Sequence, residues 1–448
     1  MRARWKLVLA VLAVLTLLAA GCGGDDDGDE TAAEDSTTTS TTEAAEEETT
    51  TTTAAEGEEE GEEVVRADAD LVIWADDTRT PVIQPFVEQF GEDNDLTVAV
   101  QELGFDDIRD RLTVAGPAGE GPDIIIGAHD WLGQLVTSGV VAPVDLGDRA
   151  EEFNPVAIDA FTYDGQLYGL PYAVENVALI RNTDLVPEAP ATFEELAQTA
   201  LDLKAEGQVD VPLAVQEDPG DPFHNYPLFT ALGGYVFGRG DDGSYDPTDL
   251  GIDSEGGLAA AEAFAQWADQ GLISSETTYD VMIESFGSGR APFAITGPWA
   301  ITQEDTGFAA TGVPYVVEPI PPVAGGEPKP FVGVQGFMVS AQAENPLAAQ
   351  TFLVDFMANE DAQVALFEAG GRPPALTAAF EQVSDDPDIA GFQAAGANGE
   401  PLPAIPEMGS VWSAWTDAYQ LVLTGQGDPR QAFTDAADQI RTLIEEGE

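Results

Sequence analysis

The stretch GPDIIIGAHDW, residues 121–131, joins a short apolar run to a polar ending. Three isoleucines follow Gly-Pro-Asp, and the chain then places His129, Asp130 and Trp131. An apolar run of this length, preceded by turn-forming residues, is typical of a buried strand. The three residues after it are therefore expected at the end of a strand.

Two earlier stretches repeat the strand pattern, DLVIWADD at 70–77 and LTVAVQEL at 96–103. Helix-like segments at 80–93 and 105–119 separate the three strands. The order strand, helix, strand, helix, strand predicts a mostly parallel sheet with helices on its faces. Ligands of such sheets bind beyond the carboxyl ends of the strands. The polar residues that follow the first and third strands are therefore expected on the ligand side.

The first part of the chain has the composition of an export signal and a tether. Basic residues precede an apolar run at 7–20, which is shorter than the roughly 20 residues of a membrane span. We predict a signal peptide over residues 1–21. Cys22 closes LLAAGC, which resembles the lipobox of bacterial lipoproteins with Ala19 where leucine is commonest, so lipidation of Cys22 is expected. Residues 22–69 are mainly acidic residues, threonine, alanine and glycine, and are expected to form a disordered tether.

Composition argues against several classes of protein. The net charge of −66 would repel phosphates, so no nucleic acid partner is expected. Cys22 is the only cysteine and the chain has two histidines, so no internal disulfide and no zinc or other metal site is expected. Glycine-rich phosphate loops and the GxSxG and HExxH motifs do not occur, and no cofactor is expected.

What is left is a set of aromatic residues, several of them beside carboxylates. Sugars present apolar faces, which aromatic rings cover, and hydroxyl groups, which carboxylates bind. Taken singly, each ring is more typical of a core position, and in a chain with 82 acidic residues any two carboxylates can look paired by chance. The residues alone therefore indicate a polar ligand, with a sugar as one option and a glycoside hydrolase left open. The aromatic residues are Trp74, Trp131, Phe223, Tyr226, Trp299 and Trp412.

From about residue 70 to residue 445 the chain resembles the maltose- and maltodextrin-binding proteins, the extracellular receptors of ABC sugar importers. The resembling stretches occur in this order: LVIWADD, GPDIIIGAHDW, YDGQLYGLPYAVENVALIRNTDLV, YPLFTALGGYVFGRGDDGSYDPTDLGIDSEG, FGSGRAPFAITGPWAI, PFVGVQGFMVS and IPEMGSVWSAW. The resemblance implies a protein without enzymatic activity that captures maltose or maltodextrins and delivers them to a membrane permease. It would be a monomer, exported and lipid-anchored to the outer face of the cytoplasmic membrane.

The resemblance also implies an α/β fold with two lobes, of the type II periplasmic-binding-protein kind, and a ligand cleft between them. Lobe one would comprise residues 70–175 and 329–382. Lobe two would comprise residues 176–328 and 383–448. The lobes would close around the sugar by a hinge motion.

Carried over position by position, the resemblance assigns ligand-binding roles on both lobes. For Asp130 the alternative is to cap the helix that follows it. The family retains a histidine at the position of His129 without a catalytic role, so we expect His129 to be structural. The implied ligand-binding residues are Asp76, Thr78, Arg79, Asp130, Trp131, Glu175, Asp221, Phe223, Trp299 and Trp412.

Four departures from the family pattern leave the exact ligand open. Gly127 stands where the family has tryptophan and Trp131 where it has arginine, so the ring is expected to have moved within the loop. Ser413 and Thr416 stand where the family has tyrosine and arginine, so one end of the groove has lost polar contacts. Maltose, longer maltodextrins, trehalose and other oligosaccharides all stay open as ligands, with a secreted glycoside hydrolase as the remote alternative.

Overall fold

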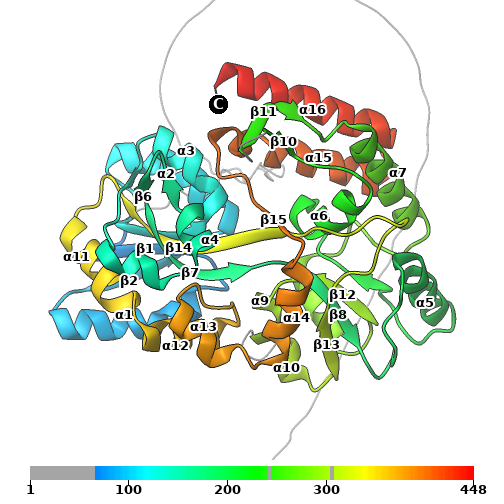
Figure 1. Cartoon of the computed structure of the whole chain (residues 1–448), viewed down its shortest axis with the longest axis horizontal. Coiled ribbons are helices and arrows are strands. Elements are labelled where there is room, and N and C mark those ends of the chain that lie inside the picture. The colour runs from blue at the N-terminus through cyan, green and yellow to red at the C-terminus, as the bar shows by residue number, and fades with distance from the viewer. Residues whose placement is uncertain (1–65, 241–243, 303–306, 448) are drawn as a thin grey trace, which may run out of the picture. The chain divides into compact units, whose positions relative to one another are not determined.

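The structure, a computed structural model, describes residues 66–240, 244–302 and 307–447 (Figure 1). These residues belong to one compact unit. The predicted signal peptide, Cys22 and the tether up to residue 65 lie outside the described residues. Within the described part of the chain, no helix combines the length and apolar character that a membrane span requires.

The sheet of the first lobe brings the three predicted strands side by side. β1 (Leu71–Ala75) pairs in parallel with β2 (Val98–Glu102) and with β3 (Ile124–Ala128), so their predicted parallel arrangement is confirmed. β14 (Phe331–Ser340) comes from much later in the chain and lies antiparallel beside β3. β14 also pairs with β4 (Val141–Ala142), β7 (Gly169–Glu175) and β15 (Glu400–Pro401).

Helices cover this sheet and share one hydrophobic core with it (Figure 1). The core includes every residue of β1, each with 0% of its surface exposed. The helices are α1 (Thr80–Asn94), α2 (Phe105–Ala118), α3 (Leu132–Thr137), α4 (Pro155–Ala160), α11 (Pro346–Thr351), α12 (Glu360–Gly370) and α13 (Thr377–Val383). Short helical turns at His129–Trp131, Gly147–Glu152 and Phe352–Met357 and the hairpin of β5 (Thr162–Tyr163) and β6 (Gln166–Leu167) complete this lobe.

The second lobe is built on a sheet with the strand order β13-β8-β12-β9. β8 (Ala178–Asn182) is antiparallel to β13 (Tyr315–Glu318) and to β12 (Phe293–Thr296), whereas β9 (Leu213–Ala214) runs parallel to β12. Alternate residues of β8 and β12 enter two different apolar clusters, because successive side chains of a strand point to opposite faces.

The helices of the second lobe share the two apolar clusters of this sheet. They are α5 (Phe193–Ala205), α6 (Pro222–Ala231), α7 (Glu255–Asp269), α8 (Tyr279–Gly287), α9 (Trp299–Thr302), α10 (Phe308–Thr311), α14 (Pro387–Gly396), α15 (Trp412–Leu423) and α16 (Pro429–Glu446). Three of them, α7, α15 and α16, pack against one another (Figure 1). A hairpin of β10 (Phe237–Arg239) and β11 (Tyr245–Leu250) and a helical turn at Pro406–Ser410 complete the lobe.

The chain passes between the two sheets more than once. It crosses between β7 and β8, between β13 and β14, and again between α13 and α14. The start of β14, which follows one of these crossings, also pairs in parallel with β15, which comes after α14, with Phe331 opposite Glu400. Each sheet keeps its own hydrophobic core, and the predicted two-lobed α/β fold is therefore confirmed.

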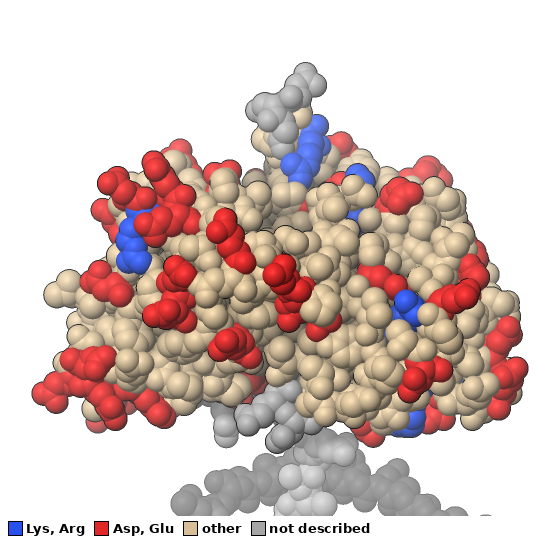
Figure 2. Space-filling model, turned by 60° about the horizontal axis from the view of Figure 1, so that its bottom comes forward, with Lys and Arg blue, Asp and Glu red and all other residues tan. Residues whose placement is uncertain are grey.

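Acidic side chains are spread over the surface drawn in Figure 2, with few basic groups among them. The chain has 16 Lys and Arg residues against 82 Asp and Glu residues, so basic side chains are scarce. Four arginines of the described residues are nevertheless buried and form ion pairs: Arg79 with Asp76, Arg109 with the exposed Asp110, Arg181 with Glu318 and Arg372 with Glu175. The pairs of Arg79 and Arg372 lie at the ends of strands in lobe one.

Candidate ligand-binding site

The end of β1 carries a compact network of polar side chains. The Asp76 carboxylate is 2% exposed and accepts hydrogen bonds from the Thr78 hydroxyl and the Arg79 backbone N–H, both at 2.9 Å. The Arg79 guanidinium also bonds to this carboxylate, and its Nε donates to the Tyr172 hydroxyl at 3.0 Å. These contacts hold Arg79 in one orientation at the start of α1.

A second carboxylate, Glu175 at the end of β7, belongs to the same network. Its Oε1 accepts from Gln335 Nε2 at 2.7 Å, and its Oε2 accepts from Arg372 Nε at 2.9 Å. Arg372 Nη2 donates to the Thr78 hydroxyl at 3.1 Å and so joins the ends of β1 and β7. Glu175 is 3% exposed and Arg372 is 6% exposed, so the pair is shielded from water and weakly screened.

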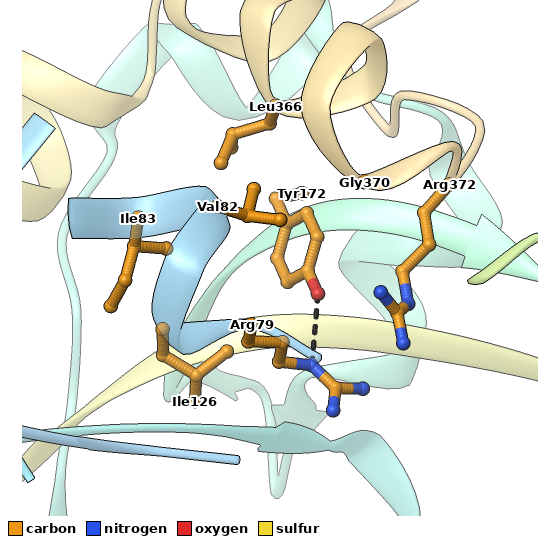
Figure 3. A pocket seen from close by; sticks show the side chains of 8 residues that line it. All are labelled: Arg79, Val82, Ile83, Ile126, Tyr172, Leu366, Gly370 and Arg372. Atoms are coloured by element: carbon orange, nitrogen blue, oxygen red, sulfur yellow. Dashed lines mark hydrogen bonds between the residues drawn. The ribbon is translucent and has the colours of Figure 1, made fainter. Parts of the chain in front are cut away.

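A narrow pocket lies beside this network (Figure 3). The guanidinium groups of Arg79 and Arg372 converge on the region of the Tyr172 hydroxyl, as Figure 3 shows. The remaining lining is apolar and comes from α1, β3 and the end of α12, with Val82, Ile83, Ile126, Leu366 and Gly370. The polar edge of the pocket is therefore formed by side chains that the network already fixes.

His129 connects the end of β3 with β14 and with the residue that follows β15. Its Nδ1 accepts from the backbone N–H of Val334 in β14 at 3.1 Å, and its Nε2 donates to the backbone carbonyl of Leu402 at 3.1 Å. Burial lowers the pKa of His129 to about 4, so the ring is neutral at neutral pH. Both ring nitrogens are engaged by backbone, which agrees with the structural role expected from the sequence.

Asp130 and Trp131 turn in different directions. Asp130 Oδ2 accepts from the indole Nε1 of Trp412 at 3.1 Å, which connects lobe one with α15 of lobe two. Trp131 is 2% exposed and lies 4.7 Å from Phe105 between ring centroids. A Cβ atom at Gly127 would lie 2.0 Å from its ring, so the ring occupies the space above this glycine. Trp131 is thus part of the lobe-one core cluster.

The start of α6 presents the polar groups of lobe two. Asp221 caps this helix by accepting from the His224 backbone N–H at 2.8 Å, and it contacts His224 Nδ1 at 2.7 Å. His224 Nε2 lies 3.4 Å from the Thr296 hydroxyl at the end of β12. Asp221 therefore fixes both the helix start and the ring of His224, beside which Phe223 lies half-buried.

Four aromatic rings form a continuous row. Phe223 lies 6.2 Å from Trp299 and 6.2 Å from Phe331 between ring centroids, and Phe331 lies 6.2 Å from Trp412. The two tryptophans at the ends are half-buried, whereas Phe331 is 1% exposed and backs the row. Such a row offers stacking surface at both ends.

Side chains of lobe one touch both ends of this aromatic row. The guanidinium carbon of Arg372 lies 5.5 Å from the ring centroid of Trp299, within the range of a cation–π contact. At the other end, Asp130 holds the indole N–H of Trp412. The described structure thus joins the polar network of lobe one to the aromatic row of lobe two at two points.

The structure distributes the sequence-predicted residues over three groups. The first group is the network of Asp76, Thr78, Arg79 and Glu175. In the second, Asp130 contacts Trp412, and in the third, Phe223 lies near Trp299 and Asp221. Among the hydrogen bonds and ring contacts of the described residues, none joins Trp131 to these groups.

Besides Trp131, two of the aromatic residues that the sequence places among the candidates belong to the core. Trp74 is 0% exposed and donates to Gln101 Oε1 at 3.1 Å. Tyr226 is 2% exposed and stacks on Phe331.

Four residues of these groups were not predicted from the sequence: Tyr172, Gln335, Phe331 and Arg372. One signal was available for Arg372, which is the only Lys or Arg between Lys329 and Arg430.

A fully buried acid lies below the start of α6. Glu217 is 0% exposed and accepts from Asn225 Nδ2 at 2.9 Å. Burial, together with the nearby charge of Asp221, raises its pKa well above the usual range. A raised pKa suits a general acid, but a side chain without exposed surface does not reach a ligand. Among the described residues, no group of three or more His, Cys, Asp or Glu side chains could hold a metal ion.

Comparison with known proteins identifies relatives over most of the chain. The family model described as bacterial extracellular solute-binding protein matches residues 86–391. A galactooligosaccharide-binding protein of Bacillus subtilis is 32% identical over 84% of this chain and 90% of its own length. A maltotriose-binding protein of Pyrococcus abyssi is 31% identical over 74% of this chain and 71% of its own. A maltooligosaccharide ABC transporter solute-binding lipoprotein of Streptococcus pneumoniae is 27% identical over 75% of this chain and 80% of its own.

Proposed function

Since the chain belongs to the bacterial extracellular solute-binding proteins, we propose that it captures a neutral oligosaccharide and delivers it to the membrane subunits of an ABC importer. The observation that carries this proposal is the aromatic row beside buried, oriented carboxylates. Aromatic rings cover the apolar faces of sugar rings, and carboxylates accept hydrogen bonds from their hydroxyl groups. The family binds solutes and does not transform them, which agrees with the prediction that the chain is no enzyme.

The ligand we propose is a maltodextrin-type gluco-oligosaccharide. Two relatives named for maltotriose and maltooligosaccharide support it, together with the collinear resemblance of the sequence to maltodextrin-binding proteins. A galactooligosaccharide is the second candidate, because a relative named for that sugar has 32% identity over 84% of the chain. Both sugars present apolar faces and hydroxyl rims, and they differ in the orientation of the 4-hydroxyl of each ring and in the linkage between rings.

Within this proposal, the polar contacts come from Asp76, Thr78, Arg79, Asp130, Glu175 and Asp221, and the stacking surface comes from Phe223, Trp299 and Trp412. Asp76, Asp130 and Glu175 are more than nine-tenths buried and already oriented by protein donors, so little ordering is left to the moment of binding. In this proposal Trp131 contributes indirectly: it packs against Phe105, which lies under the Arg79 guanidinium at 4.8 Å.

The mature protein is proposed to be a monomer, lipid-anchored through Cys22 to the outer face of the cytoplasmic membrane. The lipobox-like LLAAGC supports this, and so does a relative that is named a lipoprotein. Cys22→Ser should release the protein into the soluble fraction with unchanged sugar affinity, because the tether precedes the folded unit. A variant that stays with the membrane after a salt wash would contradict the anchor.

Thermal denaturation against a panel of sugars tests the proposed ligand. The panel contains maltose, maltotriose, maltotetraose, trehalose and β-linked galactooligosaccharides, with glucose and galactose as controls. A ligand at 100 times its dissociation constant should raise the free energy of unfolding by about 2.7 kcal/mol. Maltotriose or maltotetraose is expected to give the largest shift. A larger shift with the galactooligosaccharides would select the second candidate, and no shift with any oligosaccharide would refute the proposed function.

A further inference from the structure

Arg372 lies just after the end of α12, where lobe one contacts lobe two. The helix ends at Gly370, its C-cap Gly371 has a φ of +71°, in the left-handed region that favours glycine, and Arg372 follows directly. A Cβ atom at Gly371 would lie 2.5 Å from the Thr302 hydroxyl and 2.8 Å from the Pro298 carbonyl oxygen. The backbone of lobe one therefore lies directly against the α9 region of lobe two at this point.

The side chain of Arg372 uses this position to reach both lobes. Toward lobe one, its Nε donates to Glu175 and its Nη2 donates to Thr78, at 2.9 and 3.1 Å. Toward lobe two, its guanidinium carbon lies 5.5 Å from the ring centroid of Trp299. One planar group thus contacts two polar residues and one aromatic residue of the candidate site at the same time.

We propose that Arg372 is a positioning residue that aligns the carboxylate wall of lobe one with the stacking ring of lobe two when the lobes close. This inference rests on the proposed function and adds a residue that determines affinity. The edge of the guanidinium orients Glu175 and Thr78, while its face is available to Trp299. Closure of the lobes therefore brings the ring onto a cation that is already fixed.

The chemistry of arginine suits this role. A guanidinium is planar and carries N–H donors in a fixed fork, so donation from its edge and contact through its face are compatible. A lysine has a compact ammonium group and keeps the charge without this geometry. Arg372→Lys therefore separates the effect of the charge from that of the planar fork.

Isothermal titration with the best sugar of the panel measures the effect on affinity. Arg372→Gln should weaken the dissociation constant by about 20-fold, since a hydrogen-bonded charge next to Glu175 is lost. Arg372→Lys should weaken it by about fivefold, because the charge is kept. Trp299→Phe alone should also cost about fivefold, and the double variant Arg372→Gln/Trp299→Phe should be about 20-fold weaker, well short of the 100-fold expected for independent sites.

A matched control comes from the other buried arginine–glutamate pair. Arg181 donates from Nε to Glu318 Oε1 at 2.7 Å and lies in lobe two, within β8 and away from the aromatic row. Arg181→Gln should lower the free energy of unfolding, as Arg372→Gln does, and leave sugar affinity within about threefold. The positioning role is refuted if Arg372→Gln also leaves the affinity within threefold. It is equally refuted if the dissociation constant of the double variant rises by the full product of the two single effects.

The lobe contact is also measurable without any sugar. The full chain with Cys22→Ser accepts spin labels at Leu347→Cys in lobe one and Leu421→Cys in lobe two, positions that are 78% and 42% exposed. Arg372→Gln and Trp299→Phe should each reduce the population with the lobes closed in the distance distribution. Distributions that match the unsubstituted protein overturn the inference. If the unsubstituted protein binds no oligosaccharide, the proposed function fails, and this measurement still decides the role of Arg372.

Discussion

The contact between Asp130 and Trp412 provides the sharpest test of the candidate site. Asp130 is 5% exposed, and its Oδ2 accepts from the Trp412 indole at 3.1 Å. Asp130→Ala removes this acceptor, and it also removes the carboxylate that we propose accepts from a sugar hydroxyl. A hydrogen bond to a charged group contributes about 1.5 to 3 kcal/mol. The dissociation constant should therefore rise by roughly 10- to 150-fold, since 1.4 kcal/mol corresponds to a factor of ten.

Two further variants separate the roles of Asp130. Asp130→Asn keeps an acceptor for the indole but loses the charge, and should cost about three- to tenfold in affinity. Trp412→Phe keeps a ring but loses the N–H donor, and should cost less than Asp130→Ala if the sugar contacts the carboxylate directly. Isothermal titration with the best sugar of the panel gives the three constants. An affinity of Asp130→Ala within threefold of the parent, at unchanged stability, would refute a direct role of this carboxylate.

Three other substitutions probe packing and charge around the site. Trp299→Ala should weaken sugar binding by about 1 to 3 kcal/mol and barely change the stability of the sugar-free protein, since its ring is half-buried; equal losses of both would place it in the core. Gly127→Ala should lower the free energy of unfolding by about 1 to 3 kcal/mol, because the added Cβ meets the Trp131 ring. Urea denaturation should show a smaller loss when the same substitution is made in a Trp131→Ala background. Between pH 7 and pH 4, the free energy of unfolding of the parent protein should fall by about 3 kcal/mol more than that of His129→Gln. The reason is that the unfolded histidine gains its proton near pH 6.5 and the buried one only near pH 4. Parallel pH profiles of the two proteins would show that His129 is not buried as a neutral ring.

The local pattern of the sequence was enough to predict the strands in the first half of lobe one. The three apolar runs are β1, β2 and β3, of which β1 and β3 are buried throughout and β2 is mostly half-buried. The pattern did not indicate that β14 lies antiparallel beside β3, since the chain returns there only after building part of lobe two. A contact of such long range leaves no periodic trace in either segment.

The candidate site was predictable only through the resemblance to a family, and then only in part. Glu175 was expected, but its partners Gln335 and Arg372 were not, because they come from segments 160 and 197 residues away. The scarcity of basic residues near Arg372 was a signal, yet scarcity does not indicate which carboxylate a cation meets. Such partners follow from the packing of β7, β14 and α12, which the three-dimensional fold decides.

The loop after β3 shows how a departure from a family pattern can be accommodated through packing. Trp131 lies over Gly127, where a side chain would leave no room for its ring. The ring contacts Phe105, and Phe105 lies under the guanidinium of Arg79, which bonds to the Asp76 carboxylate. A change at position 131 therefore reaches Asp76 through a chain of direct contacts, although Trp131 itself is buried. Glycine at 127 and tryptophan at 131 act as one unit, so either residue exchanged alone would disturb the orientation of a carboxylate that neither of them touches.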